Sequence, residues 1–320
     1  MRTVVGVLRG GTSSEYDLSL ETGSAILSAL PEEKYETRDI LVDKSGMWHL
    51  RGTPATPARA LSQVDVVLNA LHGSVGEDGT VQRMLQRSGV PYAGSRALSS
   101  GLALNKIRAR EVLQTADIPM PRAVSFSLDN RMNTQDMADA VFASFGPPYV
   151  VKPPMEGSSR GIEIALTIIE LPDYIGDALD EYGAVLIEEY MLGDHATVGL
   201  IEDFRDEPVY ALPPAYISLP EDAYFHDPYH KSAASSYSVP SHFSHGQKKI
   251  IADMARRAHD ALKLAHYSDA DFVVTRHGPY LLEMNTSPHL HKRAAFPHML
   301  EAVGSSVREF LEHAISLARG

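Results

Sequence analysis

The chain has 320 residues, of which 44% are hydrophobic and 22% are charged, and its formal net charge is −12 at pH 7. This composition is ordinary for a folded protein, and the length predicts two or three domains of about 100–150 residues. The acidic balance argues against general nucleic-acid binding, which needs clustered Lys and Arg, and the absence of cysteine excludes disulfides, thiolate metal sites and a cysteine nucleophile.

The first hundred residues alternate strand-like and helix-like patterns. Thr3–Leu8 predicts a buried strand rather than a signal peptide, because Gly10 and Gly11 end the apolar run, and a helix should follow to about Leu30. Val64–Leu71 predicts a second strand, followed by a Gly-rich turn and a helix that ends at Gly89. Such alternation indicates a parallel sheet covered on both faces, with ligands bound beyond the carboxyl ends of its strands.

The middle of the chain predicts one long helix and then a set of strands. Ser99 or Ser100 can cap a helix that runs to about Ala116, before a Pro-containing break at 118–121. Strands are expected at 149–152, 161–165 and 184–187, with more strands and two late helices beyond about 195. Apolar residues from Val307 to Ile315 recur at helical spacing and predict the last helix. No stretch approaches ~18 uninterrupted apolar residues, so we expect no membrane partner and a cytoplasmic location.

The segment from Leu219 to Ser244 shows neither hydrophobic period and is rich in His, Tyr, Ser and Pro. A loop of that length in a compact domain is usually functional or disordered, and its aromatic residues favour a lid over a linker. Its histidines could suggest a metal site, but their irregular spacing favours exposed or substrate-facing side chains.

A Gly/Ser-rich loop follows the strand that ends at Lys152, and we expect this lysine to face solvent at the strand end. Its sequence from Lys152 to Gly161 is KPPMEGSSRG, in which backbone N–H groups can approach an anion closely while the lysine neutralises a phosphate. A plain Gly/Ser hairpin is the alternative for this loop alone. No Gly-Lys-Ser/Thr sequence opens a helix here, so the loop is not a Walker A motif.

Acidic residues end two apolar strands. The segment Val185–Met191 predicts a strand that ends near Glu188. Taken alone, this pattern favours a solvent-exposed carboxylate over a functional one. The later strand places Glu283 and Asn285 on one face, two residues apart, and Asp271 on the preceding strand is the expected hairpin neighbour. These oxygen ligands suit Mg²⁺.

Read in order, these motifs resemble an ATP-grasp ligase, and within that class the D-alanine–D-alanine ligase family. The resemblance covers nearly the whole chain and implies an α/β (α+β) fold, with an N-terminal parallel-sheet pre-ATP-grasp domain before a two-lobed ATP-grasp fold. We expect domains at 1–104, 105–190 and 191–320, the last with a lid loop near 219–244. The motifs are Gly10–Glu15, Leu71–Gly73, Gly76–Gly79, Pro91-Tyr92, Gly94-Ser95, Lys106 with Arg108, Lys152-Pro153, Glu156–Ser159 with Gly161, Val185–Glu188 and Leu282–Pro288.

The resemblance implies an ATP site with a bound divalent metal ion, either Mg²⁺ or Mn²⁺. It assigns the nucleotide and metal as follows: Lys106 and Lys152 to the phosphates, Ser159 with Ser158 to the loop over them, Glu188 and Met191 to the adenine edge, and Asp271, Glu283 and Asn285 to the metal.

The resemblance also implies amino acids as small-molecule substrates and a homodimer. Glu15 would receive the ammonium of the first amino acid with Ser158 in support, and His72 would lie near the reacting carboxylate. The implied chemistry is phosphorylation of that carboxylate by ATP, followed by attack of a second substrate's amine on the acyl phosphate.

Three positions depart from the family pattern. Asp269 stands where the family has an arginine that stabilises an oxyanion, and losing such a donor typically costs ~10²–10³ in rate. Ala294 and Ala295 stand where a serine–leucine pair would bind the second carboxylate, so Lys292 or Arg293 could serve instead, or be surface cations.

The third departure is His195, which stands where an acid would bind the ribose, although Asp194 could reach that site. In the lid, Tyr229 and Lys231 offer the family's lysine and tyrosine in shuffled order.

Three hypotheses follow from this mixture of matches and departures. The first is a D-alanine–D-alanine ligase of peptidoglycan synthesis. The second is an ATP-grasp ligase with another amino-acid or small-acid acceptor. The third is a non-catalytic nucleotide-binding homologue, and the retained lysines and metal ligands favour an enzyme over it.

Overall fold

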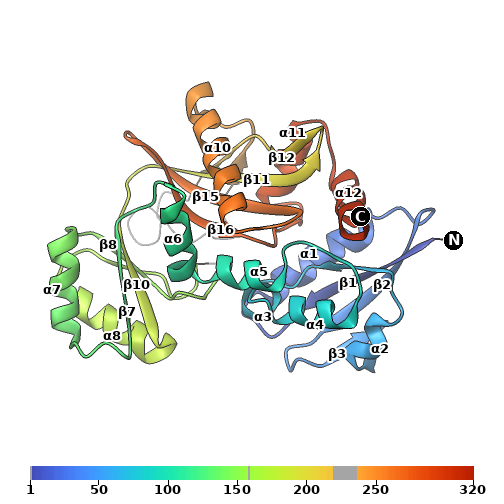
Figure 1. Cartoon of the computed structure of the whole chain (residues 1–320), viewed down its shortest axis with the longest axis horizontal. Helices are drawn as coiled ribbons and strands as arrows, with labels where there is room; N and C mark the ends of the chain where they lie inside the picture. The colour runs from blue at the N-terminus through green and yellow to red at the C-terminus, as the bar shows by residue number, and fades with distance from the viewer. Residues whose placement is uncertain (1, 158, 219–235) are drawn as a thin grey trace.

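The computed structural model describes residues 2–157, 159–218 and 236–320, which form three β-sheets with helices packed against them (Figure 1). The mixed α/β architecture expected from the sequence is confirmed, with a largely parallel sheet first and two antiparallel sheets after it. No helix within the described ranges is long and apolar enough to cross a membrane.

The first sheet has the order β4-β3-β2-β1-β5-β6. Strand β1 lies parallel to β2 and β5, and β5 lies parallel to β6, while β3 and β4 extend the edge in antiparallel fashion. The carboxyl ends of β1 and β5 therefore meet at one edge, as predicted. The strands are β1 (Thr3–Gly10), β2 (Tyr35–Val42), β3 (Trp48–Leu50), β4 (Thr53–Ala55), β5 (Val66–Asn69) and β6 (Tyr92–Ala93).

Helices from both ends of the chain cover this sheet. Phe310 and Ile315 of the last helix share a core with Val5 and Val7 of β1, so the C-terminus packs beside the N-terminal domain (Figure 1). The predicted stop at Gly89 is confirmed, since this residue has φ 71° and ends α4. The helices of this region are α1 (Tyr16–Ala29), α2 (Pro57–Leu61), α3 (Gly73–Glu77), α4 (Thr80–Ser88) and α5 (Ala97–Leu104).

The single helix predicted from Ser99 or Ser100 to Ala116 is wrong. Both serines lie inside α5, and Asn105 is extended and separates α5 from α6 (Lys106–Thr115). The Asn105 side chain accepts the backbone N–H of Arg108 at 3.1 Å, so it caps a new helix instead of continuing the old one. The break places Lys106 at a helix N-terminus.

The second sheet is antiparallel and has the order β7-β10-β8-β9. Helices α7 (Thr134–Ser144) and α8 (Leu171–Tyr182) pack on it, with Val141 and Ile175 fully buried against Tyr149. The strands predicted near 149–152, 161–165 and 184–187 are confirmed. The four strands are β7 (Ala123–Ser127), β8 (Tyr149–Lys152), β9 (Glu163–Ala165) and β10 (Ala184–Glu189).

The third sheet has the order β14-β13-β11-β15-β16, and β12 pairs with β11. Among the described residues, three helices (α10, α11 and α12) accompany this sheet where the sequence predicted two. Helix α10 begins with a capping box between Ser244 and Gln247. The elements are β11 (Asp194–Phe204), β12 (Glu207–Ala211), β13 (Ala215–Ser218), β14 (Ser236–Ser238), α10 (His245–Ala261), β15 (Tyr267–Thr275), β16 (Gly278–Asn285), α11 (Ala295–Ala302) and α12 (Val307–Arg319).

The expected lid segment, 219–244, is described only from residue 236. Its described part contains a short strand, β14, where the sequence predicted a loop without either period. Tyr229 and Lys231 lie outside the described residues, as does Ser158 of the Gly/Ser loop.

Candidate active site

Lys152 ends β8 and faces Glu188 on the neighbouring strand β10. Its Nζ lies 2.6 Å from a Glu188 carboxylate oxygen, and Arg110 of α6 lies 3.3 Å from the other oxygen. Lys152 was expected at a solvent-facing strand end, but it is only 3% exposed, so that expectation is wrong. The physical reason is that α6 covers this strand end and contributes a second cation to the buried carboxylate.

Lys106 occupies the first position of α6 and joins two segments distant in sequence. Its backbone N–H donates to the carbonyl of Pro154 at 2.8 Å, and its Nζ donates to the carbonyl of Glu156 at 2.8 Å. The same Nζ lies 3.3 Å from a carboxylate oxygen of Glu283. The positive end of a helix and an ammonium group therefore meet beside the Gly/Ser loop, an arrangement that favours an anion.

The predicted acidic hairpin is present on β15 and β16. Asp271 is the cross-strand partner of Glu283, and Asp269 is the partner of Asn285, so all four side chains share one face. The Asn285 Nδ2 donates to Asp269 at 2.8 Å and to Asp271 at 3.2 Å. Two carboxylates and an amide form an oxygen-donor set that fits Mg²⁺, because a flip of the amide presents its oxygen to the ion.

Two cavities adjoin at these residues. The smaller, about 40 Å³, is lined by both lysines, Asp271 and His195, and the larger, about 280 Å³, is lined by Glu15, Glu77 and Asp269. Lys106, Ser159 and Glu283 line both. The two cavities therefore meet along these three residues.

Glu15 lies at the start of α1 and is 6% exposed. The Gly/Ser loop reaches this carboxylate through Gly157, where an added Cβ would lie 2.4 Å from Glu15 Oε1. A side chain at position 157 would therefore displace the end of the Glu15 side chain. The loop backbone thus lies directly against this carboxylate.

Glu77 is a second carboxylate of the larger cavity; it belongs to the Gly76–Gly79 motif but was assigned no role there. It accepts the backbone N–H of Gly73 at 3.0 Å and the hydroxyl of Thr286 at 3.4 Å. Burial, and then the nearby carboxylates of Glu15 and Asp269, raise the pKa of Glu77 to about 8. At neutral pH Glu77 therefore favours its protonated form.

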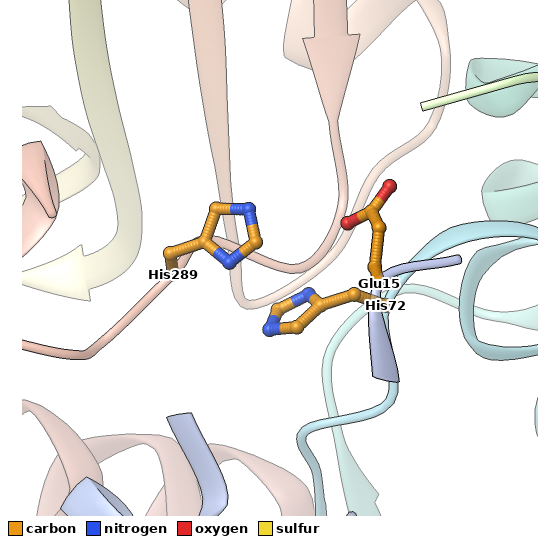
Figure 2. Close-up of side chains that lie close together, drawn as sticks. All are labelled: Glu15, His72 and His289. Carbon is orange, nitrogen blue, oxygen red and sulfur yellow. The ribbon is translucent and has the colours of Figure 1, made fainter. Parts of the chain in front are cut away.

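His72 precedes α3 and is 2% exposed. Its Nε2 lies 3.1 Å from Thr22 Oγ1, and burial lowers the pKa of His72 to about 3, so the ring is neutral. Figure 2 shows Glu15, His72 and His289 pointing toward one another from three separate segments. His289 is not among the residues predicted for the site from the sequence.

The departures from the family pattern fall mainly around the larger cavity. Asp269 and Arg293 line it, whereas Ala294 and Ala295 are buried and offer no polar group. The Arg293 guanidinium is largely exposed and lies 3.3 Å from Glu21.

The other predicted residues follow β10 or lie on β11. Met191 follows β10, and His195 is on β11 beside the smaller cavity. Asp194 pairs with His242 at 3.3 Å. In the described part of the chain, Glu15, His72 and His289 are grouped closely enough to hold a metal through histidine.

Comparison with known proteins identifies close similarity over the full chain. The family model described as D-ala D-ala ligase C-terminus matches residues 112–316, and that described as D-ala D-ala ligase N-terminus matches 51–95. The chain is 32% identical over 316 residues to a D-alanine–D-alanine ligase of Desulforudis audaxviator, covering 98% of each chain. It is 33% identical to that of Geobacter sulfurreducens, covering 97% of this chain and 92% of the relative.

Solved structures show the same similarity. The D-Ala:D-Ser ligase of Enterococcus faecalis superposes with a TM-score of 0.86 at 25% identity, covering 99% of this chain and 100% of that one. The D-alanine–D-alanine ligase of Bacillus anthracis complexed with ATP has a TM-score of 0.81 at 26% identity, with coverage of 99% and 97%.

Proposed function

The chain belongs to the D-alanine–D-alanine ligase family, and from this premise we propose that it joins two amino acids into a dipeptide at the expense of ATP. The enzyme class is an ATP-dependent ligase that forms a C–N bond. The proposed product is D-alanyl-D-alanine for peptidoglycan synthesis, made by a cytoplasmic homodimer that associates through its first domain.

The junction of the two cavities is the observation that carries this proposal. Lys106, Ser159 and Glu283 line both the smaller and the larger cavity. A ligase that works through an acyl phosphate must bring a nucleotide's terminal phosphate and a carboxylate to one point. The shared residues provide a cation and a metal ligand at that point.

The smaller cavity is the proposed phosphate site. Lys106 and Lys152 would neutralise the phosphates, and Asp271, Glu283 and Asn285 would hold the metal, with Mg²⁺ favoured by the oxygen donors. The bound metal supplies further neutralisation of phosphate charge. Glu188 and Met191 are proposed for the adenine edge, and Glu188 also holds Lys152 in position through their 2.6 Å contact.

The larger cavity is the proposed amino-acid site. Glu15 would bind the ammonium group of the first amino acid. The ring of His72 would lie near the reacting carboxylate and, being neutral, would add no full charge there. Ser158, Tyr229 and Lys231 stay proposals from the family resemblance, since they lie outside the described residues. Arg293 is proposed for the second carboxylate.

The proposed reaction has two steps. A carboxylate oxygen of the first amino acid attacks the terminal phosphorus of ATP, and ADP leaves with the electron pair of the broken P–O bond. The amine of the second substrate then attacks the carbonyl carbon, phosphate leaves, and the amine loses a proton. The protein's part in the first step is positioning and charge neutralisation by Lys106 and Lys152.

A second candidate function is ligation of D-alanine to a different acceptor. Asp269 lines the larger cavity and places a carboxylate where the family has a cation, so it repels a second carboxylate and attracts a second ammonium group. Ala294 and Ala295 cannot donate a side-chain hydrogen bond. Both observations favour an acceptor other than D-alanine, in the same reaction.

Phosphate release measured with ATP, Mg²⁺ and single amino acids tests the proposal. Release that depends on D-alanine and is absent with L-alanine or with EDTA is the expected result. Turnover that is indifferent to every amino acid would contradict a ligase. The mass of the dipeptide then separates the two candidate acceptors.

A further inference from the structure

Three side chains with metal-binding atoms converge in the wall of the larger cavity. Glu15, His72 and His289 each offer a ligand atom, and these atoms all lie within 4.8 Å of one another (Figure 2). The residues come from the start of α1, the turn before α3 and the loop after β16. We propose that they bind a divalent transition-metal ion of the zinc type, at a site distinct from the nucleotide's metal site.

The donor atoms select this class of ion. Two imidazoles and one carboxylate form the ligand set of open zinc sites, and imidazole suits Zn²⁺, Ni²⁺ and Co²⁺. The hairpin of Asp271, Glu283 and Asn285 instead offers only oxygen, which suits Mg²⁺. The two sites therefore differ in chemistry as well as in position.

The local geometry also fits an ion. Zinc bonds of 2.0–2.2 Å place two ligand atoms of a tetrahedral site roughly 3.4 Å apart. The ligand atoms here all lie within 4.8 Å of one another, at most about 1.4 Å more than this value. The rings of His72 and His289 have centroids 4.2 Å apart and are tilted by 47°, so they are not stacked face to face.

Thr22 supports one ligand from behind. Its Oγ1 lies 3.1 Å from His72 Nε2 and accepts the backbone N–H of Leu290 at 3.5 Å. A partner of this kind fixes the ring orientation of metal-binding histidines. The other ring nitrogen of His72, Nδ1, is buried and has no well-oriented hydrogen-bond partner among the described residues, which makes it the ligand atom.

The electrostatic surroundings favour a cation as well. Glu77 and Asp269 line the same cavity, so two further carboxylates lie near the ion. If Glu15 also receives the ammonium of the first amino acid, which rests on the proposed function, the ion and that substrate compete. The site would then make ligation sensitive to zinc.

Titration of tag-free, nucleotide-free protein tests the site without requiring ligase activity. Zn²⁺ binding is measured by calorimetry, and Co²⁺ serves as a spectroscopic probe because its visible absorption reports nitrogen and oxygen coordination. One ion per chain is expected. His289→Gly should weaken binding at least about a hundredfold, since even outer-shell partners of metal ligands are worth 10–100-fold.

Two control variants assign the binding to these residues. His291→Gln removes a neighbouring imidazole whose ring centroid is 5.7 Å from that of His289, and Glu283→Gln alters the Mg²⁺ hairpin; both should leave zinc affinity within a few-fold. His72→Gln removes the buried imidazole ligand and should also weaken zinc binding. A thermal melting curve checks that this variant is folded. Absence of stoichiometric binding, or equal affinity in His289→Gly, would overturn the proposal.

Competition separates this inference from the proposed function. D-alanine should raise the apparent Kd for zinc if Glu15 serves both ligands. Zinc binding that D-alanine leaves unchanged would keep the metal site and refute the assignment of Glu15 to the substrate ammonium.

Discussion

The two cavities of the site balance their charges in different ways. Around the smaller one, cations face anions directly, as Lys152 and Arg110 face Glu188 and Lys106 faces Glu283. Around the larger one, carboxylates gather together with neutral histidine, and the pKa of Glu77 rises to about 8. The smaller cavity matches the family pattern apart from His195, whereas the larger contains Asp269. The reversal of charge relative to the family pattern therefore lies in the larger cavity, which is the proposed amino-acid site.

The largest expected effect comes from Lys152→Ala, which removes one cation of the buried ion pair with Glu188 beside the smaller cavity. Removing one partner of a buried ion pair costs about 3–5 kcal/mol, and we expect about 3 because Arg110 still faces Glu188. Affinity for ATP should fall as well. Urea unfolding and calorimetry with ATP check both effects. Unchanged stability and unchanged ATP affinity would refute the role of this pair.

Glu283→Gln should lower turnover at saturating ATP at least about a hundredfold, because it weakens a direct metal ligand and outer-shell changes already cost 10–100-fold. The folded structure should persist, since Glu283 is partly exposed in the cavity. Steady-state kinetics at several Mg²⁺ concentrations measure the effect, with Glu301→Gln on the surface as the matched control. An equal loss of turnover in both variants would show that the effect does not come from a weakened metal ligand.

The crowded carboxylates of the larger cavity predict a pH effect. The folded pKa of Glu77, about 8, lies above its unfolded value near 4.5, so the folded state holds a proton that the unfolded state has released. The free energy of unfolding should therefore fall between pH 6.5 and 8, by at most about 2 kcal/mol. The lowered pKa of His72 acts below this window, where it increases stability as pH rises.

Urea unfolding across that pH range measures the slope, and Glu77→Gln should remove it. Asp269→Asn should shift the slope to lower pH, because it removes a negative charge that raises the pKa of Glu77. A slope that persists in Glu77→Gln would assign the effect to another group.

Arg293→Ala should have the smallest effect. Its guanidinium is exposed and pairs with Glu21 at 3.3 Å, so unfolding should change by less than about 1 kcal/mol. The KM for the acceptor should rise a few-fold if Arg293 binds its carboxylate. Lys292→Ala, an exposed neighbour, is the control for a general charge effect. Identical KM values for the acceptor in both variants would contradict a role of Arg293 in binding the acceptor carboxylate.

Local patterns in the sequence explain why parts of the fold and site were predictable. The two-residue period of the last two strands placed Asp271, Glu283 and Asn285 on one face, and Gly89 marked a helix end because glycine adopts positive φ readily.

Tertiary contacts explain what was missed. The burial of Lys152 depends on α6 crossing a distant strand, and His289 meets His72 only through the folding of segments more than two hundred residues apart. The helix break at Asn105 was missed because the capping serines upstream offered an equally good local start. Glu77 became notable only through neighbours in space.

Product analysis from one reaction tests the proposed function most directly, that this ligase joins two molecules of D-alanine at the expense of ATP. The enzyme is given ATP, Mg²⁺, isotope-labelled D-alanine and an equal mixture of D-amino acids and amines, and the products are sequenced by mass spectrometry. D-alanyl-D-alanine is expected as the dominant ATP-dependent product. A dominant product with D-alanine at the amino end and a different acceptor would instead support the second candidate function, and ATP consumption without any ligated product would contradict the ligase itself.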